Sequence, residues 1–547
     1  MIYKMKKINL FLLLVLFATA TFASEVKPVK NVILMIPDGT SIGVYSAARW
    51  YKIYNNLGDG LHVDPYFTGT VSTFSSNAPI GDSAPTTSAY MTGVPSRTGH
   101  VSIYPVHDPE NDLYPIDSTM AYQPLTTILE ASRIENNKAT GLVVTCEFPH
   151  ATPADCAAHH YNRGNYKAIA PQMAYQNLDV MFGGGNGILT DDIKQHFKNN
   201  GTNLIQDDKN AMLNYNDNNP VWALFGDRAM PYDIDRNPDE VPSLSEMTQK
   251  ALDILSKKEN GFFLMVEGSA IDWAAHGNDP VGIITEFLAF DEAVGRAIDF
   301  AKKDGETAVI VLSDHGNSGF TIGKSGCPGY DRLTIEQLFG AVSKCKLTVS
   351  GMEGKLIKTK PENMKDEFKR YTDIDLNDDE LKSLLTSKNY KEGGNNEDAK
   401  TSSLHSNILK IINSKMCFGF TTGGHTGEEV LLAAYHPEGT LPMGHLKNTD
   451  INDYLFKVSG LETPLPEMTQ RIFAKHTEVF AGMNYSIEDK DADIPVLVVK
   501  KGKKTLRIPA FSSVATIDGK AFDLGSVTVY IDKNDTFYLP RILKDKL

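Results

Sequence analysis

The stretch Asn31–Gly39, which reads Asn-Val-Ile-Leu-Met-Ile-Pro-Asp-Gly, carries the pattern on which the fold prediction depends. Its apolar residues follow one another without polar alternation, which is typical of a strand buried on both faces of a sheet. Such strands belong to parallel sheets that helices cover on both sides. The stretch therefore predicts a central strand of an α/β sheet, and Asp38 follows that strand almost at once.

Three further apolar runs have the same form, and each is followed by acidic or histidine side chains. They are Gly141–Thr145 before Glu147 and His150, Gly261–Val266 before Glu267, Asp272 and His276, and Ala308–Leu312 before Asp314 and His315. Ligands of open α/β sheets bind beyond the carboxyl ends of the strands. A single Asp at a strand end often serves only the turn. Four such ends favour a site for zinc, or for zinc with a harder ion such as magnesium.

The wider pattern predicts a three-layer α/β/α sandwich with a central, mostly parallel sheet. Strand-like runs alternate with helix-like stretches from about residue 30 to residue 340. Leu125–Ile134 and Ser245–Leu255 have helical spacing, whereas Asn199–Asn219 is rich in Asn and Asp and is interpreted as a loop. We expect an inserted crown-like region and a small C-terminal β extension in addition to this core.

Changes of composition suggest where these parts begin and end. The predicted parts are a signal peptide (1–23), an α/β core (24–340), an insertion or crown region (341–417), the continued core (418–487) and a β-rich extension (488–547). Within the insertion, Asn377–Leu385 predicts a capped helix and Glu392–Ser403 a loop. The extension contains three short β-like runs, at residues 494–500, 505–511 and 526–532.

The N-terminus has the layout of a secretory signal peptide. Lys4, Lys6 and Lys7 precede the apolar run Ile8–Phe17, and small residues end the segment near Ala23. The alternative is a membrane anchor, but the run is too short to cross a bilayer. We therefore expect export to the periplasm or the medium after cleavage near Ala23. No later run of apolar residues is long enough to predict a membrane span.

The charge and the cysteines exclude two classes of site. The full chain has a formal net charge of −14, which argues against nonspecific nucleic-acid binding because that needs a basic surface. A small anionic substrate is compatible with this charge, since bound cations can reverse the local field. The chain has 5 cysteines, so at least one thiol is unpaired. No CxxC pair occurs, so a cysteine zinc site is not indicated, and the disulfide pairing stays open.

A serine beside an acidic residue is the candidate nucleophile. The segment Gly81–Gly93 places Ser83 before a run of small residues that predicts a helix, and a helix N-terminus favours an anion. The simpler alternative is that Asp82 or Ser83 only caps this helix. The segment lacks the G-x-S-x-G pattern of serine-triad hydrolases. Ser83 would then need another activator, and coordination to a metal is one.

Six short motifs, taken in order, make the chain resemble the alkaline phosphatase family. They are VILMIPDG, DSAPTTSAYMTG, HATPADCAAHHYNR, EGSAIDWAAH, LSDHG and GGHTGEEV, which together cover about Asn31–Pro437 apart from the insertion. The resemblance implies an exported, metal-dependent phosphomonoesterase. Such an enzyme hydrolyses small phosphate monoesters to an alcohol and inorganic phosphate at alkaline pH, through a phosphoserine intermediate.

The resemblance also implies a role for each matching residue. Ser83 would attack phosphorus and Arg163 would bind the phosphate, which suits the bidentate geometry of a guanidinium. Two Zn²⁺ and one Mg²⁺ are implied as cofactors. Their ligands would be Asp272, His276 and His425 for the first zinc, Asp38, Asp314 and His315 for the second zinc, and Asp38, Thr152 and Glu267 for the third ion. Asp272 and His276 are four residues apart, so one helical turn would direct both at one ion.

Three positions depart from the pattern of some family members. His150 and Trp273 stand where those members have Asp and Lys, and Asn317 replaces a histidine. His150 could bind the third ion directly or through a water molecule. Because imidazole is softer than carboxylate, the third ion could then be zinc or cobalt. Asn317 is expected to change a hydrogen bond behind a ligand and so to tune zinc affinity.

Two other functions compete with the phosphomonoesterase. One is a related metal-dependent phosphodiesterase or sulfatase on the same scaffold, against which Arg163 and the third ion site argue. The other is a catalytically silent binding module in which the β-rich tail is the working part, against which the intact Ser83 argues. A homodimer is an expectation of the resemblance alone, because the sequence carries no dimer signature. The natural substrate and the role of the tail stay open.

Overall fold

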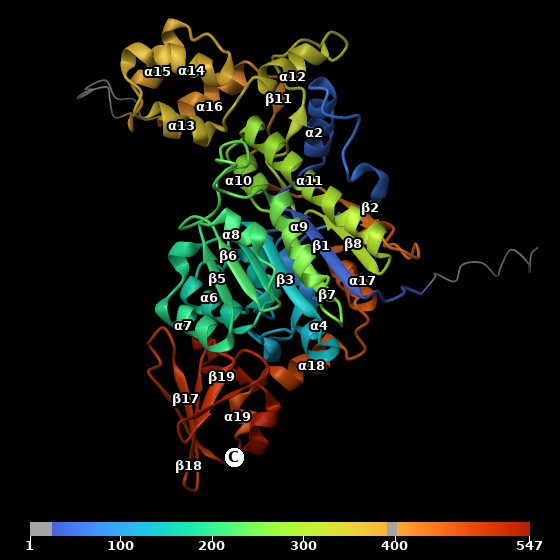
Figure 1. The fold of residues 1–547 in the computed structure, drawn as a ribbon, viewed down its shortest axis with the longest axis vertical. Coiled ribbons are helices and arrows are strands. Elements are labelled where there is room, and N and C mark those ends of the chain that lie inside the picture. The colour runs from blue at the N-terminus through green and yellow to red at the C-terminus, as the bar shows by residue number, and fades with distance from the viewer. Residues whose placement is uncertain (1–24, 391–401, 547) are drawn as a thin grey trace, which may run out of the picture.

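A ten-stranded sheet lies at the centre of the computed structural model, which describes residues 25–390 and 402–546 (Figure 1). The predicted signal peptide and most of the predicted loop Glu392–Ser403 lie outside the described residues. Across the sheet the strands are β14 (Gly444–Lys447), β2 (Phe67–Ser72), β13 (Val430–Tyr435), β8 (Thr307–Leu312), β1 (Asn31–Pro37), β7 (Phe262–Gly268), β3 (Ala139–Glu147), β4 (Val180–Gly184), β6 (Val221–Leu224) and β5 (Asn203–Gln206). Only β13 pairs antiparallel with its neighbours in this sheet, so the prediction of a mostly parallel sheet is confirmed.

The central strands are apolar throughout because each of their faces meets a separate hydrophobic core. In β1, Ile33 and Met35 pack into one core, whereas Val32, Leu34 and Ile36 pack into the other. Successive side chains of a strand point to opposite faces, so alternating residues enter alternating cores. Burial of both faces explains why β1 shows no polar alternation.

Helices cover both faces of the sheet and complete the three predicted layers. The helices that pack into the first core include α2 (Ile42–Tyr54), α8 (Lys209–Asn214), α9 (Leu244–Leu255), α10 (Ala270–His276) and α11 (Pro280–Asp304). Those in the second core are α3 (Ser83–Thr92), α4 (Ile128–Asn136), α5 (Ala151–Ala157), α6 (Tyr166–Tyr175), α7 (Asp191–Asn200), α17 (Asn448–Val458) and α18 (Leu465–Ile472). Short 3₁₀ turns lie at Asp64–Tyr66, Ser118–Met120, Asn186–Ile188, Pro361–Asn363, Asp532–Asn534 and Arg541–Lys546.

The two helices predicted from apolar spacing are confirmed, with shifts of a few residues. Both begin with a capping box, in which Thr127 and Glu130 cap α4 and Ser243 and Glu246 cap α9. The prediction of a loop over Asn199–Asn219 is wrong, because this segment contains β5 and α8. Its polar residues include caps of short elements: the Asp208 carboxylate accepts from the backbone of Ala211 at the start of α8.

A group of helices stands at one end of the molecule, at the top of Figure 1. It consists of α12 (Ile335–Ser343), α13 (Val349–Leu356), α14 (Met364–Thr372), α15 (Asp378–Leu385) and α16 (Leu404–Ser414). The predicted capped helix is confirmed as α15, with Asn377 and Glu380 in a capping box. The group leaves and rejoins the rest of the chain at a two-stranded ribbon, β10 (Thr321–Ile322) with β11 (Phe418–Gly419). A disulfide between Cys327 and Cys417 closes the segment beside this ribbon.

The C-terminal residues form β structure at the opposite end, drawn in red in Figure 1. One antiparallel sheet contains β16 (Asn484–Glu488), β17 (Val496–Lys501), β18 (Lys504–Pro509), β19 (Val514–Ile517) and β20 (Lys520–Asp523). A smaller sheet contains β15 (Ala474–Lys475), β22 (Thr536–Leu539) and β21 (Val529–Ile531), beside the short helix α19 (His476–Val479). The three predicted β-like runs are confirmed as β17, β18 and β21. Among the described residues, no helix combines the length and apolar character needed to cross a membrane.

Candidate active site

The four apolar strands that the sequence singled out are neighbours in the sheet and run in the same direction. Their order is β8, β1, β7 and β3, and all three contacts between them are parallel. Their carboxyl ends therefore meet at one edge. Glu267 in β7 is paired in register with Ile36, two residues before Asp38. The strand order thus brings together carboxylates that are more than 200 residues apart in sequence.

One group of donors lies at the ends of β1 and β8. Asp38, Asp314 and His315 each offer a ligand atom, and these atoms lie within 4.8 Å of one another. The His315 Nε2 atom is 3.4 Å from Asp38 Oδ1 and 3.4 Å from Asp314 Oδ2. The other oxygen of Asp314 accepts from the backbone N–H groups of Gly39 and His315, each at 3.0 Å. The backbone thus holds one oxygen of Asp314 and leaves the other for the cluster.

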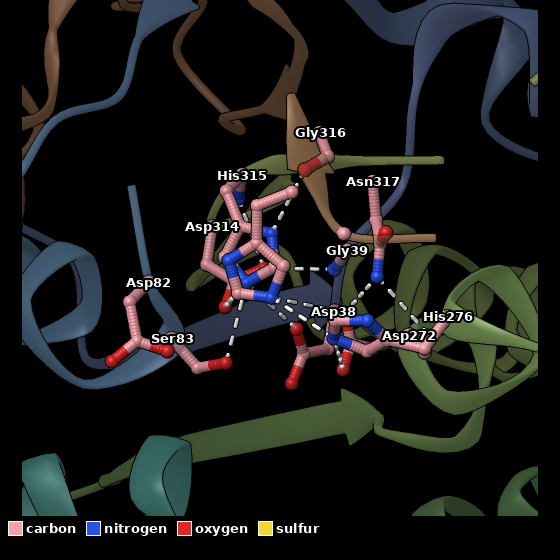
Figure 2. A network of polar contacts seen from close by, with 12 residues as sticks. Asp38, Gly39, Asp82, Ser83, Asp272, His276, Asp314, His315, Gly316 and Asn317 are labelled. Atoms are coloured by element: carbon pink, nitrogen blue, oxygen red, sulfur yellow. Dashed lines mark hydrogen bonds and ion pairs between the residues drawn. The ribbon is translucent and has the colours of Figure 1, made fainter. Parts of the chain in front are cut away.

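A second group lies beside the first and includes a residue from a distant loop. Asp272 and His276 are on α10, and His425 comes from β12 (His425–Thr426), which pairs antiparallel with β9 (Gly316–Asn317). Their ligand atoms also lie within 4.8 Å of one another. Figure 2 shows Asp272 and His276 on one side of the cluster and Ser83 on the other. Pairing of His425 with Asn317 is the contact that places the loop histidine in the site.

All three histidines are held in the same tautomer. The Nδ1 atom of His276 lies 2.9 Å from the carbonyl oxygen of Gly423, that of His315 lies 3.1 Å from Gly316, and that of His425 lies 2.8 Å from Gly81. A carbonyl oxygen can only accept, so each Nδ1 must donate a proton. Each Nε2 then presents a lone pair to the cluster, which is the arrangement of a metal-bound imidazole.

The contacts between these lone pairs require a positive charge between them. His276 Nε2 lies 3.1 Å from His425 Nε2, and both Nδ1 atoms already carry the proton that a neutral ring has. Two lone pairs at this distance repel each other unless a cation lies between them. The donor set therefore fits a divalent metal ion that takes imidazole nitrogen and carboxylate oxygen.

The buried carboxylates give the same indication. Both oxygens of Asp38 are buried and lack a hydrogen-bond partner, and so do Glu267 Oε1 and Asp314 Oδ2. Burial raises the pKa of Asp38 well above its usual range, and Asp314, Asp272 and Glu267 raise it further. Burial likewise raises the pKa of Glu267 to about 8. Charged carboxylates crowded in this way are stable only when they are paired or bind a metal.

Ser83 occupies the first position of α3 and faces the first of these groups. Its Oγ atom lies 3.2 Å from His315 Nε2, and Ser83 is buried (2% exposed). The side chain of the N-cap residue Asp82 makes no capping hydrogen bond. The alternative that Asp82 only caps the helix with its side chain is therefore not supported. A hydroxyl at a helix N-terminus, directed at a cluster of metal-ligand side chains, has the setting of an activated nucleophile.

Arg163 reaches the same place from the loop before α6. Its Nη1 atom donates to Asp82 Oδ1, and its Nη2 atom lies 3.4 Å from His150 Nε2. The Arg163 guanidinium holds the pKa of Asp82 below its usual range although burial opposes this. Asp82 thus fixes one side of a guanidinium beside Ser83, and this partner of Arg163 was not foreseen from the sequence.

A third group of donors lies at the ends of β3 and β7. It contains Cys146, His150 and Glu267, whose ligand atoms lie within 4.8 Å of one another. The sequence analysis assigned Asp38, Thr152 and Glu267 to the third ion and did not include Cys146. The Thr152 hydroxyl is buried without a hydrogen-bond partner, two residues after His150 at the start of α5. The only sequence signal for Cys146 was its position at the strand end, one residue before Glu147.

Asn317 and Trp273 occupy two of the positions at which the sequence departs from the pattern of some members of the family that it resembles. Asn317 donates from Nδ2 to Asp272 Oδ1 at 2.7 Å and to the Asp272 backbone carbonyl at 3.2 Å. Trp273 packs edge-on against His150, with ring centroids 5.8 Å apart. Asn317 therefore orients a carboxylate of the second group, and Trp273 orients the imidazole of the third.

We expect Asn317→Ala to weaken zinc binding by about 10- to 100-fold, which is the usual effect of losing a partner behind a metal ligand. The affected ion is the one that Asp272, His276 and His425 would hold. Zinc release to a chromophoric chelator would measure the change. Asn452→Ala is the matched control, because Asn452 is also buried and donates to a backbone carbonyl, that of Tyr90. Equal zinc release from both variants would contradict this role for Asn317.

His159, His436 and Glu147 lie near the motifs, and each has a structural partner. His159 is buried between the carbonyl of Ser102 (2.9 Å) and the Glu130 carboxylate (3.1 Å). His436 contacts the carbonyl of Lys27 at 2.9 Å. Glu147 accepts from the Tyr166 hydroxyl at 3.1 Å. None of the three residues belongs to the groups of metal-ligand side chains that the described residues form.

The fold and the site define a class of protein: an α/β sandwich with a serine and three groups of metal-ligand side chains at the carboxyl edge of its sheet. A family model for alkaline phosphatase matches residues 29–461. Alkaline phosphatase 3 of Bacillus subtilis (strain 168) is 33% identical over 451 residues, which are 78% of this chain and 88% of the relative. The chain belongs to the alkaline phosphatase family, and it is a phosphatase.

Solved structures agree with this assignment. The crystal structure of a cold-active alkaline phosphatase from the psychrophile Shewanella sp. matches with a TM-score of 0.68 and 27% identity, over 79% of this chain and 100% of that chain. Another match is a variant of the alkaline phosphatase from the Antarctic bacterium TAB5, in which a histidine is replaced by aspartate and Mg is bound in the M3 site. It has a TM-score of 0.55 and 25% identity, and it covers 80% of this chain and 100% of that chain.

Proposed function

We propose that this protein is an exported, metal-dependent phosphomonoesterase that acts at alkaline pH through a phosphoserine at Ser83. The position of Ser83 carries the proposal: its Oγ atom lies at the N-terminus of α3 and 3.2 Å from His315 Nε2. A phosphoryl group on this oxygen would lie beside the backbone N–H groups of the helix and the Arg163 guanidinium. The substrates would be small phosphate esters.

The cofactors that we propose are two Zn²⁺ and one Mg²⁺, and the unpartnered donors are the observation that supports them. Asp38, Asp314 and His315 would hold one zinc, and Asp272, His276 and His425 would hold the other. Bound divalent ions would lower the pKa of Ser83 and stabilise charge on the leaving oxygen. The chain itself would direct the Ser83 oxygen at phosphorus from the first turn of α3. His315, with its Nδ1 proton donated to Gly316, would keep the Nε2 lone pair toward the same space.

Arg163 would bind two non-bridging oxygens of the phosphate. Its partner Asp82 restrains the guanidinium on the side away from His150. Release of phosphate would require the guanidinium to give up these oxygens, while Asp82 keeps it from following the product. Hydrolysis of the phosphoserine would then return Ser83 to its starting state.

We propose that the third ion is held by Asp38, Thr152 and Glu267, with His150 as a further donor. The donors fit a cation because Thr152 Oγ1 and Glu267 Oε1 are buried without partners. Burial lowers the pKa of His150 to about 4, so its imidazole is neutral and able to bind a metal. In the TAB5 enzyme, Mg in the M3 site accompanies replacement of a histidine by aspartate. That observation supports a softer ion, zinc or cobalt, as the alternative to magnesium in a site that contains histidine.

Comparison of three substrates tests the reaction class. The purified, metal-loaded protein would be given an aryl phosphate, a bis-aryl phosphate and an aryl sulfate at alkaline pH. We expect the aryl phosphate to be turned over at least about 100-fold faster than the other two, because Arg163 and three cations match a dianion. Preferred turnover of the diester or the sulfate would overturn the proposal in favour of a phosphodiesterase or a sulfatase.

A further inference from the structure

The third group of donors differs from the other two because it contains sulfur. Cys146 lies at the end of β3, and Glu267 lies at the end of the neighbouring parallel strand β7. The Cys146 Sγ atom is 3.5 Å from Glu267 Oε2. His150 follows three residues after β3, as the N-cap residue of α5. Side chains from two strands and one helix N-terminus thus point into the same small volume.

The atoms around Cys146 are ready to accept a cation. Glu267 Oε1 and Thr152 Oγ1 are both buried and have no hydrogen-bond partner. Cys146 and Glu267 are fully buried (0% exposed), so water does not supply the missing contacts from the surface. Buried polar atoms are rarely left without a partner, and an ion is one explanation when several converge. Sulfur, nitrogen and oxygen donors at these distances form a mixed ligand set.

We propose that Cys146 is a direct ligand of the third ion and makes this site select Zn²⁺ over Mg²⁺. The inference rests on the proposed function, and for the third cation of that site it replaces magnesium by zinc, the alternative given above. Mg²⁺ prefers oxygen ligands in near-octahedral geometry, whereas thiolate and imidazole favour zinc. Binding replaces the S–H bond of Cys146 by a bond to the metal, and the proton leaves to solvent without a change of oxidation state. The thiolate and Glu267 would then supply two negative charges to the divalent ion, beside the Asp38 carboxylate of the same ligand set.

The absence of a CxxC pair does not argue against this role. A CxxC pair supplies two sulfurs from one turn, but here one sulfur joins ligands that come from other elements. The other free cysteines among the described residues are Cys156 and Cys345, and neither belongs to a group of metal-ligand side chains. Cys156 lies on α5, with Sγ directed at the Thr152 carbonyl oxygen at 3.6 Å. Cys345 follows α12, and its Sγ atom faces the Ala341 carbonyl oxygen.

Titration with Co²⁺ tests the proposal in the full-length protein. Chelator-stripped protein would be titrated with Co²⁺ alone while the near-ultraviolet absorption is recorded. A cobalt–thiolate bond gives an intense charge-transfer band in this range, whereas cobalt bound only to nitrogen and oxygen does not. We expect the native protein to develop this band. Its absence at full cobalt occupancy would overturn the proposal, whether or not any variant folds.

Three variants assign the band to one sulfur. Cys146→Ser should abolish it, whereas Cys156→Ser and Cys345→Ser, which also remove buried free thiols, should keep it. In competition between Zn²⁺ and Mg²⁺, Cys146→Ser should lower the preference for zinc by about tenfold or more, with the third equivalent of metal affected. A band that persists in Cys146→Ser, or an unchanged preference, would show that Cys146 is only a buried thiol beside Glu267.

The result can be separated from failure of the proposed function. Ser83→Ala should lose hydrolysis and keep the cobalt–thiolate band, because Ser83 is not among the donors of the third group. Loss of hydrolysis without a thiolate band in the native protein would overturn only the role of Cys146. Full hydrolysis by Ser83→Ala would overturn the proposed function. The cobalt–thiolate band would still decide whether Cys146 binds the metal.

Discussion

Replacing Ser83 by alanine will lower phosphatase turnover by at least about 10³-fold, which corresponds to about 4 kcal/mol of lost transition-state stabilisation. The proposed reaction passes through a phosphoryl group on Ser83 Oγ, and alanine has no oxygen to accept it. The helix N-terminus, Arg163 and the metal ligands stay in place in this variant. A steady-state assay with an aryl phosphate at alkaline pH, on protein of verified metal content, measures the effect.

Two observations separate the loss of a nucleophile from general damage. The metal content of Ser83→Ala should equal that of the native protein, because the three groups of donors do not include Ser83. Ser88→Ala is the matched control on the same helix, since the Ser88 hydroxyl bonds to Ser96 and to the Val94 carbonyl. It should lose about 1 kcal/mol of stability and keep turnover within about threefold. Turnover by Ser83→Ala at the native rate would place the active centre elsewhere.

Removing the metal ions with a chelator will also abolish turnover, by about 10³-fold or more, since bound cations are expected to activate Ser83 and to stabilise the leaving oxygen.

Removing the metal ions will in addition destabilise the folded protein as the pH rises. Burial raises the pKa of Glu267 from 4.5 to about 8 and that of Asp38 in the same direction. Without cations the folded protein holds these protons more tightly than the unfolded chain does. This contribution to stability is fully present below pH 4.5 and is lost as the pH rises through about 8.

The expected result is a difference in Tm between metal-loaded and metal-free protein that widens from pH 5 to pH 9. Thermal unfolding of both forms across this range measures it. Burial also raises the pKa of Glu286 to about 8, but Glu286 is not among the metal-ligand groups. It therefore contributes equally to the pH dependence of the metal-loaded and the metal-free protein. Glu267→Gln should flatten the pH dependence of the metal-free protein only. A difference in Tm that stays constant or narrows would show that the buried carboxylates do not control how stability depends on pH. Turnover that survives verified metal loss would refute the proposed mechanism.

Much of the fold could be predicted because its central strands are local patterns. The apolar runs before Asp38, Glu267 and Asp314 indicated buried strands. Helical spacing of apolar residues indicated α4 and α9, and capping residues indicated α15. The segment Asn199–Asn219 was misread because its short strand and helix lie at the sheet edge. Elements at an edge bury little apolar surface, so their periodicity is weak and their capping residues resemble those of a loop.

The sequence by itself determined which residue types stand at the strand ends and in what order the motifs occur, because each motif is a local run. The tertiary structure decided how those ends combine. It paired Cys327 with Cys417, directed Nδ1 of His276, His315 and His425 to carbonyls, set Asp82 against Arg163 and set Asn317 against Asp272. It also placed Cys146 beside Glu267. Apart from the contact of His315 with the adjacent Gly316, these contacts join residues that are far apart in the chain. They depend on strand order, register and side-chain packing, none of which a local pattern contains.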